Sequence, residues 1–233
     1  MEFQDDNLEL IRRILPLAVM DKRGLLRLPA ERVLAEKLDV QRAKIRDALA
    51  LLENFGFIKR LQGNGTFIEM PKPYFAQVYF DIAIQLGFIS VEAMDSARET
   101  LEQSIAPLAA KDASPQEIAE LRRLCDVMVS ESHVEEIVDA DIKFHTLLAA
   151  MTRNPVIVIL LQSLAPVLRG VLLRRRSMVA HSHLSSSPMN TNHYPIVEAL
   201  ERRDPEAARQ AMAAHFSYWH KEYQISAMLK FGE

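Results

Sequence analysis

Four side chains in the second half of the sequence have the types that bind a transition-metal ion. Asp141 and His145, in the segment DADIKFHTLL, are four residues apart, so on a helix they share a face. His193 and His215 follow on two later predicted helices. One carboxylate and three imidazoles suit zinc, or else nickel or manganese, and leave positions for water or an organic acid. Singly, each histidine is more often a surface or core residue, so the four alone are a weak signal.

A second group has the chemistry of nucleic-acid recognition. Arg42 and Arg46 lie one helical turn apart in QRAKIRDALALLENFG, beside Gln41 and Lys44. The apolar residues of this segment recur at i, i+3, i+4 and i+7 and form one buried stripe: Ile45, Ala48, Leu49 and Leu52. The arginines therefore face away from the core, and their flat guanidinium matches O6 and N7 of guanine. On charge alone, a solvated basic helix is the competing interpretation.

The stretch FIKRLQGNGTFIEM contains two β-rich runs around Gly63-Asn64-Gly65. Asn-Gly between such runs is the strongest short-range signal of a β-hairpin. Gly63 and Gly65 at its tip would let the backbone approach a DNA duplex closely, where a side chain would clash. An ordinary hairpin is the alternative.

The elements that must position the basic residues precede this hairpin. We expect a helix over residues 8–20, ended or kinked by Pro16, and a short helix in AERVLAEKLDV before the one that contains Arg42. Helix, helix, short turn, helix and hairpin is the order of a winged helix-turn-helix. Pro71-Lys72-Pro73 then marks a domain boundary, because two prolines in three residues continue neither a strand nor a helix.

Beyond this boundary the sequence has almost no strand signal. Three helix starts have a capping residue followed by proline, at Ser114, Asn154 and Asp204. Residues 181–188 (HSHLSSSP) are predicted to form a polar loop. Arg174-Arg175-Arg176 is interpreted as a solvated helix end, with a second nucleic-acid site as the alternative. The expected helices are 74–87, 91–111, 115–131, 134–151, 155–180, 189–202 and 205–229.

Composition limits the class of protein. About half of the 233 residues are apolar and a quarter are charged, as in ordinary globular proteins. The single cysteine, Cys125, excludes an intramolecular disulfide framework and favours a reducing compartment. We find no signal peptide and no apolar run long enough to span a bilayer, so we expect a cytoplasmic protein without membrane contact. Residues 1–70 hold 12 Lys/Arg against 11 Asp/Glu, which permits DNA binding without establishing it.

The segment from Leu28 to Ile68 resembles the DNA-binding domain of the GntR family, whose pattern contains LPSER, GVSR, VREAL and a GxGTFV wing. The matching residues are Leu28, Pro29, Glu31, Arg32, Leu34, Ala35, Val40, Arg42, Arg46, Ala48, Leu49, Leu52, Gly56, Gly63, Gly65, Thr66 and Phe67. The resemblance implies DNA contacts by Arg32, Arg42, Arg46 and the wing at Gly65. Asp39 replaces the family's turn glycine, Gln41 its serine and Asp47 its glutamate. Because Gln41 lies where bases are read, we expect an operator that differs from the family's commoner sites.

Residues from about 74 to 230 resemble the FCD ligand-binding domain of the FadR subfamily, an antiparallel helical bundle. The likeness rests on ARETLE around Arg98, on DADIKFH with its following Asn154-Pro155, and on NHYPIVEALERRDPEAARQAMAAHF. It implies that Asp141, His145, His193 and His215 hold the ion in metal-containing members. It also implies a pocket-facing role for Arg98, with a surface salt bridge to Glu102 as the alternative. His133, His181, His183 and His220 match no such role and are interpreted as structural or solvated.

Together these observations predict a mainly α protein of two domains. Residues 1–70 form a winged helix-turn-helix, 71–75 a linker, and 76–233 an all-α bundle of six or seven helices that binds metal and effector and dimerises. The expected function is a ligand-responsive regulator, in the first instance a repressor, that binds a palindromic operator in double-stranded DNA as a homodimer and senses a small carboxylate. The alternative is a metal-dependent hydrolase with a basic appended domain, but the motifs HExxH and GxSxG and a glycine-rich phosphate loop are absent. We therefore expect no enzyme.

Overall fold

A computed structural model describes residues 3–70, 73–181 and 191–230, and the chain separates into two units, residues 1–78 and 79–233. Each unit is described by itself. The mainly helical fold class is confirmed, with a small antiparallel sheet in the first unit. The predicted polar loop at 181–188 and the start of the predicted helix 189–202 fall almost wholly outside the described residues.

The first unit contains helices α1 (Phe3–Ile14), α2 (Glu31–Leu38) and α3 (Arg42–Asn54). The predicted helix over 8–20 begins earlier, at Phe3, and the predicted interruption at Pro16 is confirmed, because α1 ends at Ile14 and Pro16 lies in a short 3-10 turn, Leu15–Leu17. The carboxylate of Asp21 accepts backbone hydrogen bonds from Arg23 and Leu25 and closes a tight turn. This turn pairs β1 (Val19–Met20) with β2 (Leu26–Leu28), two strands that the sequence analysis did not expect.

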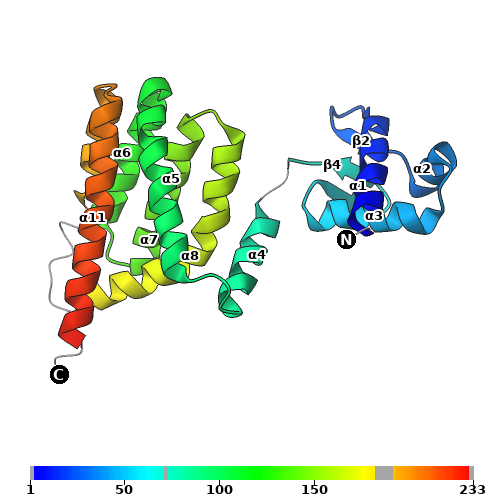
Figure 1. Ribbon diagram of the computed structural model, residues 1–233. Coiled ribbons are helices and arrows are strands. Elements are labelled where there is room, and N and C mark those ends of the chain that lie inside the picture. Colours follow the sequence, from blue (N-terminus) through cyan, green and yellow to red (C-terminus); the bar gives the residue numbers. More distant parts are fainter. Residues whose placement is uncertain (1–2, 71–72, 182–190, 231–233) are drawn as a thin grey trace. The chain divides into compact units, whose positions relative to one another are not determined.

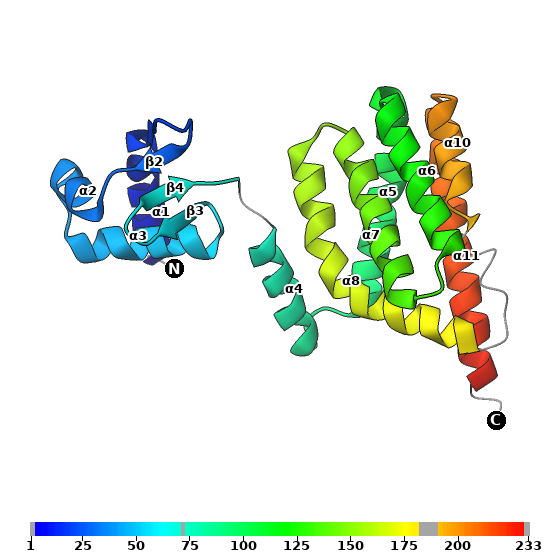
Figure 2. The same ribbon diagram turned by 180° about the vertical axis from the view of Figure 1, so that it is seen from behind.

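The predicted wing is confirmed as the hairpin of β3 (Ile58–Leu61) and β4 (Gly65–Ile68). The sheet order is β1-β2-β4-β3, so β2 extends the hairpin through antiparallel pairing with β4. Figure 2 shows β3 and β4 beside α3. The core of the unit lies between the helices and the sheet and is formed by residues such as Ile14, Leu34, Ile45 and Leu49.

The turn between α2 and α3 contains an unusual backbone conformation. Asp39 has a φ of 53°, in the left-handed region that favours glycine, and the next amide, of Val40, donates to the carbonyl of Ala35. Aspartate is one of the few other residues that tolerate this region. The aspartate in place of the family's turn glycine therefore keeps the turn.

The second unit is a bundle of mostly long helices (Figure 1), and its connections before residue 181 and after residue 194 are short. Its helices are α4 (Tyr74–Gln85, which begins in the first unit), α5 (Val91–Asp112), α6 (Pro115–Ser130), α7 (Val134–Met151), α8 (Pro155–His181), α10 (Tyr194–Glu201) and α11 (Pro205–Lys230). The predicted caps are confirmed, since side-chain oxygens of Ser114, Asn154 and Asp204 accept amide hydrogens of the first turns of α6, α8 and α11.

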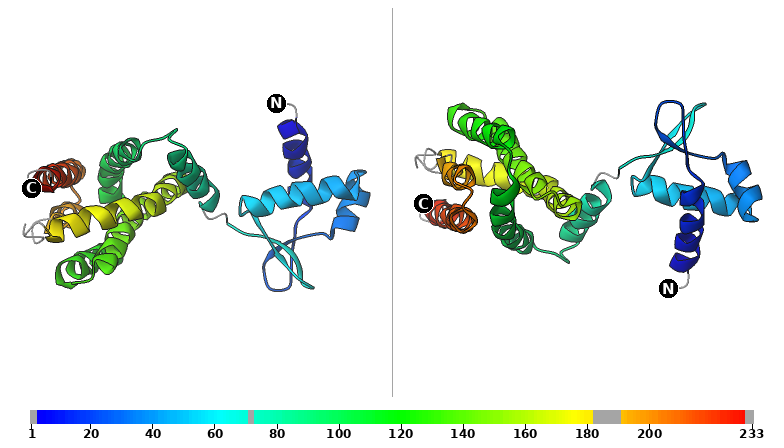
Figure 3. Two further views of the ribbon diagram at one scale, coloured as in Figure 1. Left: turned by 90° about the horizontal axis from the view of Figure 1, so that it is seen from below. Right: turned by 90° about the horizontal axis from the view of Figure 1, so that it is seen from above.

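Helix α8 is bent by 51° between residues 155–165 and 168–174. Pro166 lies at the bend, where its missing amide hydrogen interrupts the helical ladder. As a result the first half of α8 runs beside α7, and the second half, in yellow, turns across one end of the bundle toward α11 (Figures 1 and 3). No single helix in the described ranges is long and apolar enough to cross a membrane, although the two halves of α8 pass that test together.

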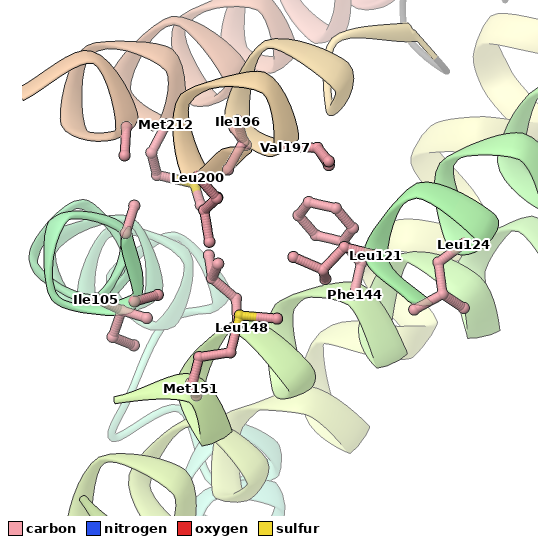
Figure 4. Packing of buried hydrophobic residues seen from close by; sticks show 14 of the residues in the cluster. Ile105, Leu121, Leu124, Phe144, Leu148, Met151, Ile196, Val197, Leu200 and Met212 are labelled. Carbon is pink, nitrogen blue, oxygen red and sulfur yellow. The ribbon is translucent and has the colours of Figure 1, made fainter. Parts of the chain in front are cut away.

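The core of the second unit lies between α5, α6, α7, α10 and α11. Phe144 and Leu148 of α7 are fully buried and face Ile105 of α5, Leu121 of α6 and Leu200 of α10 (Figure 4). Because α7 is central, residues one turn from its core positions are enclosed by neighbouring helices. Polar residues there must find partners within the protein.

Candidate functional site

Seven ionisable side chains are buried together in the second unit, each no more than 6% exposed. We call them the buried polar cluster: Arg98, Glu102, Asp141, His145, Arg176, His193 and His215. They come from α5, α7, α8 and α11, with His193 in the turn that precedes α10. The structure thus brings together the four residues predicted to hold a metal and also Arg98.

Helix periodicity explains how α7 supplies its two members of this cluster. Asp141 and His145 lie one turn apart on the same face of α7. The core residues Phe144 and Leu148 lie three residues after Asp141 and His145 respectively, so the polar face borders the apolar core. Asp141 is 1% exposed and His145 is 2% exposed, so both side chains are almost completely shielded from water. Buried polar groups of this kind need partners to offset their lost hydration.

The three imidazoles of the cluster converge. Each of His145, His193 and His215 has a ring nitrogen within 4.8 Å of those of the other two. Ring centroids are 4.5 Å apart for His193 and His215 and 5.2 Å apart for His145 and His215. Three nitrogens this close are compatible with ligands of a single ion.

Two hydrogen-bonding contacts orient these rings. Nδ1 of His145 contacts the carboxylate of Glu102, and Nδ1 of His215 lies 3.1 Å from the amide oxygen of Asn192. An acceptor oxygen at Nδ1 favours the tautomer with its hydrogen on that nitrogen, which leaves the Nε2 lone pair available. Glu102 and Asn192 therefore prepare His145 and His215 to bind an ion through Nε2.

Asp141 lies among positive and hydrogen-donating groups. One carboxylate oxygen is 3.1 Å from Nε2 of His193 and 3.4 Å from the Arg176 guanidinium, and the other is 3.6 Å from that of Arg98. Burial opposes ionisation, but the hydrogen bond to His193 and the nearby positive charges hold the pKa of Asp141 well below its usual value. Asp141 is therefore an anion near neutral pH.

Burial has the opposite effect on two of the histidines. Desolvation lowers the pKa of His193 and holds that of His215 well below the ordinary value of 6.5. Both imidazoles are consequently neutral at physiological pH. Neutral imidazole and ionised carboxylate are the forms in which these side chains bind metals.

Unpartnered nitrogen atoms are a second indication that the cluster fits a divalent metal ion. Nδ1 of His193 and Nε2 of His145 are buried and have no hydrogen-bond partner among the described residues. Such unsatisfied nitrogens are costly in a protein interior, and an ion would satisfy them. Asp141, His145, His193 and His215 are the residues that would hold it. When bound, it would supply a Lewis-acidic centre for the carboxylate of a small ligand.

Two interpretations of arginines require correction. Arg98 and Glu102 form a salt bridge of 2.6 Å, but both are buried, so this pair is not on the helix surface and Arg98 faces the cluster. Arg176 was expected at a solvated helix end and is instead 5% exposed beside Asp141. The physical reason is the bend in α8, which directs its second half across the bundle.

A sequence signal for Arg176 does exist. Leu164, Leu168 and Leu172 are buried and recur at every fourth residue, and Arg176 is the next position in that series. In α5 the same spacing relates Met94, Arg98 and Glu102. A charged residue that continues an apolar stripe is a candidate for burial. For Asn192, in a turn, we find no such signal.

The remaining histidines do not join the cluster as far as the structure describes them. His133 is exposed, directly precedes α7 and contacts Glu131, which raises the pKa of the His133 imidazole. Glu131, His133 and Glu136 form a further group of possible ligand atoms at the surface. The side chains of His181, His183 and His220 lie outside the described residues.

In the first unit, the residues predicted to contact DNA lie on one exposed helix face. Arg42, Lys44 and Arg46 of α3 are exposed, opposite its buried stripe. Gln41 is exposed at the N-terminal end of α3, and its side chain makes no capping hydrogen bond. This end of α3 therefore presents exposed donor side chains, of which Arg42 and Lys44 also pair with acidic residues of the same unit, Glu31 and Asp6.

Other charged residues form ion pairs beside this helix face. Arg32 on α2 pairs with Glu36 at 2.6 Å and is exposed. Glu31 lies 3.4 Å from Arg42 on α3 and 3.5 Å from Arg60 on β3. Glu31 thereby links the helix start to the wing, a role that the sequence analysis did not assign.

The two wing glycines have backbone reasons to be glycine. Gly63 and Gly65 have φ values of 73° and 114°, which L side chains rarely adopt. A Cβ at Gly65 would also lie 2.6 Å from Nε of Arg27, whereas Gly63 has open space around it. An approach of the Gly63 backbone to DNA would therefore meet no side chain at that position.

Comparison with known proteins follows the division into two units. Residues 25–68 match the family described as bacterial regulatory proteins, gntR family. Residues 94–218 match the FCD domain. The gntR match contains the α2–α3 pair and the wing, and the FCD match contains the buried polar cluster.

Several curated relatives extend over most of the chain. The "Putative L-lactate dehydrogenase operon regulatory protein" of Escherichia coli K12 is 30% identical, and the alignment covers 87% of this chain and 81% of the relative. The "Exu regulon transcriptional regulator" of the same strain is 27% identical over 81% of this chain and 72% of its own length. Among solved structures, Streptococcus agalactiae GntR has a similar fold, with a TM-score of 0.63, 24% identity and coverage of 93% and 97% of the two chains.

Proposed function

The chain belongs to the gntR family of bacterial transcription regulators and carries an FCD domain, and from this premise we propose that its FCD unit is a metal-dependent sensor of a small organic acid. One observation carries the proposal: three imidazoles and an ionised carboxylate converge in the buried polar cluster. Two of the imidazole nitrogens, Nδ1 of His193 and Nε2 of His145, have no hydrogen-bond partner among the described residues. Zinc is the first candidate, with nickel and manganese as alternatives.

Arg98 supports the choice of an acid. Its guanidinium is buried, reaches Asp141 at 3.6 Å and is fixed by Glu102. A fixed guanidinium beside a divalent ion would attract a carboxylate by charge and by paired hydrogen bonds. The name of the Escherichia coli relative refers to an operon for L-lactate dehydrogenase, which agrees with a small hydroxy acid as ligand class.

The first unit is the DNA-binding part. We propose that Arg42, Arg46, Lys44 and Gln41 read the major groove, that Arg32 and the wing at Gly63 and Gly65 contact the duplex, and that two copies bind a palindromic operator as a homodimer in the cytoplasm. Repression is the proposed sign of regulation. Residues 71–75 are the proposed connection between the domains. The relatives are regulators, so the hydrolase alternative is set aside.

Metal analysis of the purified protein tests the sensor. We expect about one zinc, nickel or manganese ion per chain in the wild type and none in His145→Ala/His193→Ala, because two of the ligands are then missing. His133→Ala removes a histidine of the exposed surface group and should keep the ion, since His133 lies outside the buried polar cluster; loss of the ion in this variant would assign it to the surface group instead. A wild-type protein that binds none of these ions, as purified or after their addition, contradicts the metal site.

A further inference from the structure

Arg27 of β2 lies against the tip of the wing, although the sequence analysis gave it no role. Its register partner in the sheet is Phe67 of β4, and its side chain extends from there toward the wing turn. A Cβ on Gly65, the first residue of β4, would lie 2.6 Å from Nε and 2.8 Å from Nη2 of Arg27. The guanidinium therefore occupies the space of a side chain at Gly65, so the wing presents bare backbone at Gly63 and a positive charge at Gly65.

The Arg27 side chain is held by an aromatic ring and keeps its charge unpaired. Its guanidinium carbon lies 5.9 Å from the centroid of the Phe67 ring, which is 3% exposed. Arg23, in the turn between β1 and β2, covers the same ring at 5.2 Å, but Asp21 binds that arginine at 2.9 Å. Among the residues that the structure describes, Arg27 has no ion pair or hydrogen bond of its guanidinium.

A second cation lies on the same face of the sheet. Lys59 of β3 is also the register partner of Phe67, and residues directly opposite each other in a sheet point to one face. Leu28 and Ile68, the next residues along β2 and β4, point the other way, into the core between sheet and helices. Arg27 and Lys59 are thus two exposed cations on the outer face, and neither is paired with a described acid. Such a face complements a polyanion.

We propose that Arg27 is a phosphate-binding residue of the DNA-binding unit, which contacts the backbone of the duplex beside the wing tip. The proposal rests on the proposed DNA binding and deepens it, because it adds a contact from β2 to those of α3 and the wing. A phosphate fits better than a base edge, since Arg27 lies on a strand beside the wing and its planar fork matches phosphate oxygens. Contact with Phe67 also restricts the side chain before DNA binds.

The salt dependence of DNA binding by the full-length protein tests this role. The probes are a duplex from the protein's own promoter and a scrambled duplex of the same length and composition, and anisotropy gives both affinities at several salt concentrations. Arg27→Met keeps an apolar cover on Phe67 but removes the charge. We expect both duplexes to bind about five- to tenfold more weakly at about 100 mM salt. The slope of log affinity against log salt should become shallower by about 1, because one phosphate contact is lost.

Two further variants separate a phosphate contact from a structural role. Arg27→Lys keeps the charge and should keep the wild-type slope. Arg23→Met is the matched control, since it removes the other cation on the Phe67 ring, which Asp21 already pairs, and should leave slope and affinity unchanged. Thermal melting of each variant establishes that it is folded at the temperature of the assay.

Three results overturn the proposal: a wild-type slope in Arg27→Met, equal losses in Arg27→Met and Arg23→Met, or a loss confined to the promoter duplex, which would indicate base reading instead. These results leave DNA binding by the first unit intact. A wild type that binds neither duplex contradicts the proposed function itself, and the role of Arg27 with it.

Discussion

At the scale of residues, the recognition surface depends on two arginines at the start of α3. Arg42→Ala and Arg46→Ala should each weaken binding to a specific operator by about 1–3 kcal/mol, because each removes a forked donor that base edges can accept. Both side chains are exposed, so the fold should be little affected. Fluorescence anisotropy at fixed salt measures the effect.

The exposed arginine Arg12 on α1 provides the control, since it lies outside the recognition helix and pairs weakly with Glu9. Arg12→Ala should bind the operator as the wild type does. If the Arg42→Ala/Arg46→Ala double variant also keeps wild-type affinity, α3 does not read this DNA.

Residue spacing predicted which side chains share a helix face. It predicted less well whether that face is buried against other helices or exposed to solvent. The i, i+4 spacing of Asp141 and His145 was enough to place them together on α7. The four-residue spacing of the buried leucines of α8 indicates that Arg176 shares their face, but the bend near Pro166 and packing across the bundle decide that its charged end is buried. Tertiary contacts decided that case.

At the scale of elements, the start of α6 is fixed by an unusually well-partnered glutamate. Glu117 completes a capping box with Ser114 and accepts two hydrogen bonds, of 2.6 and 2.7 Å, from Arg153. The Arg153 hydrogen bonds lower the pKa of Glu117 most, from its ordinary value of 4.5 to about 2. A carboxylate with a depressed pKa stabilises the fold above its unfolded pKa and loses that effect as pH falls toward the folded value.

Glu117→Gln should therefore lower the free energy of unfolding by about 1 kcal/mol at pH 7, a figure reduced for solvent screening because Arg153 is half exposed. The difference from wild type should shrink as pH falls from about 4.5 toward about 2. Calorimetric unfolding at several pH values measures it. Glu120→Gln, which breaks an exposed pair with Arg123 on the same helix, should have little effect, and equal losses in the two variants would contradict a special role for Glu117.

Element order was the most predictable level of the fold. Caps and periodicity located the helices of the second unit closely, and Asn-Gly located the wing. The strands β1 and β2 were missed because two- and three-residue strands have no periodicity to detect. Their pairing depends on the Asp21 turn and on β4, a partner distant in sequence.

At the scale of the whole molecule, one recognition helix reads only a few base pairs. Specific binding should therefore require two copies of the chain on a palindromic site, with half-sites about one helical turn of DNA apart. Light scattering should give twice the 26.5 kDa chain mass, and titration of operator DNA should saturate at two chains per site. A monomeric mass together with one chain bound to an asymmetric half-site would contradict this assembly.

The central claim is that the buried polar cluster controls DNA binding by the first unit. It is tested most directly by the affinity of the full-length protein for DNA from its own promoter, measured by anisotropy with and without small hydroxy and dicarboxylic acids. At least one acid should change the affinity of the metal-loaded wild type by about 5- to 150-fold, a typical coupling between two sites. His145→Ala/His193→Ala should bind the same DNA with near wild-type affinity and respond to none of the acids. A double variant that responds as the wild type does would contradict the account.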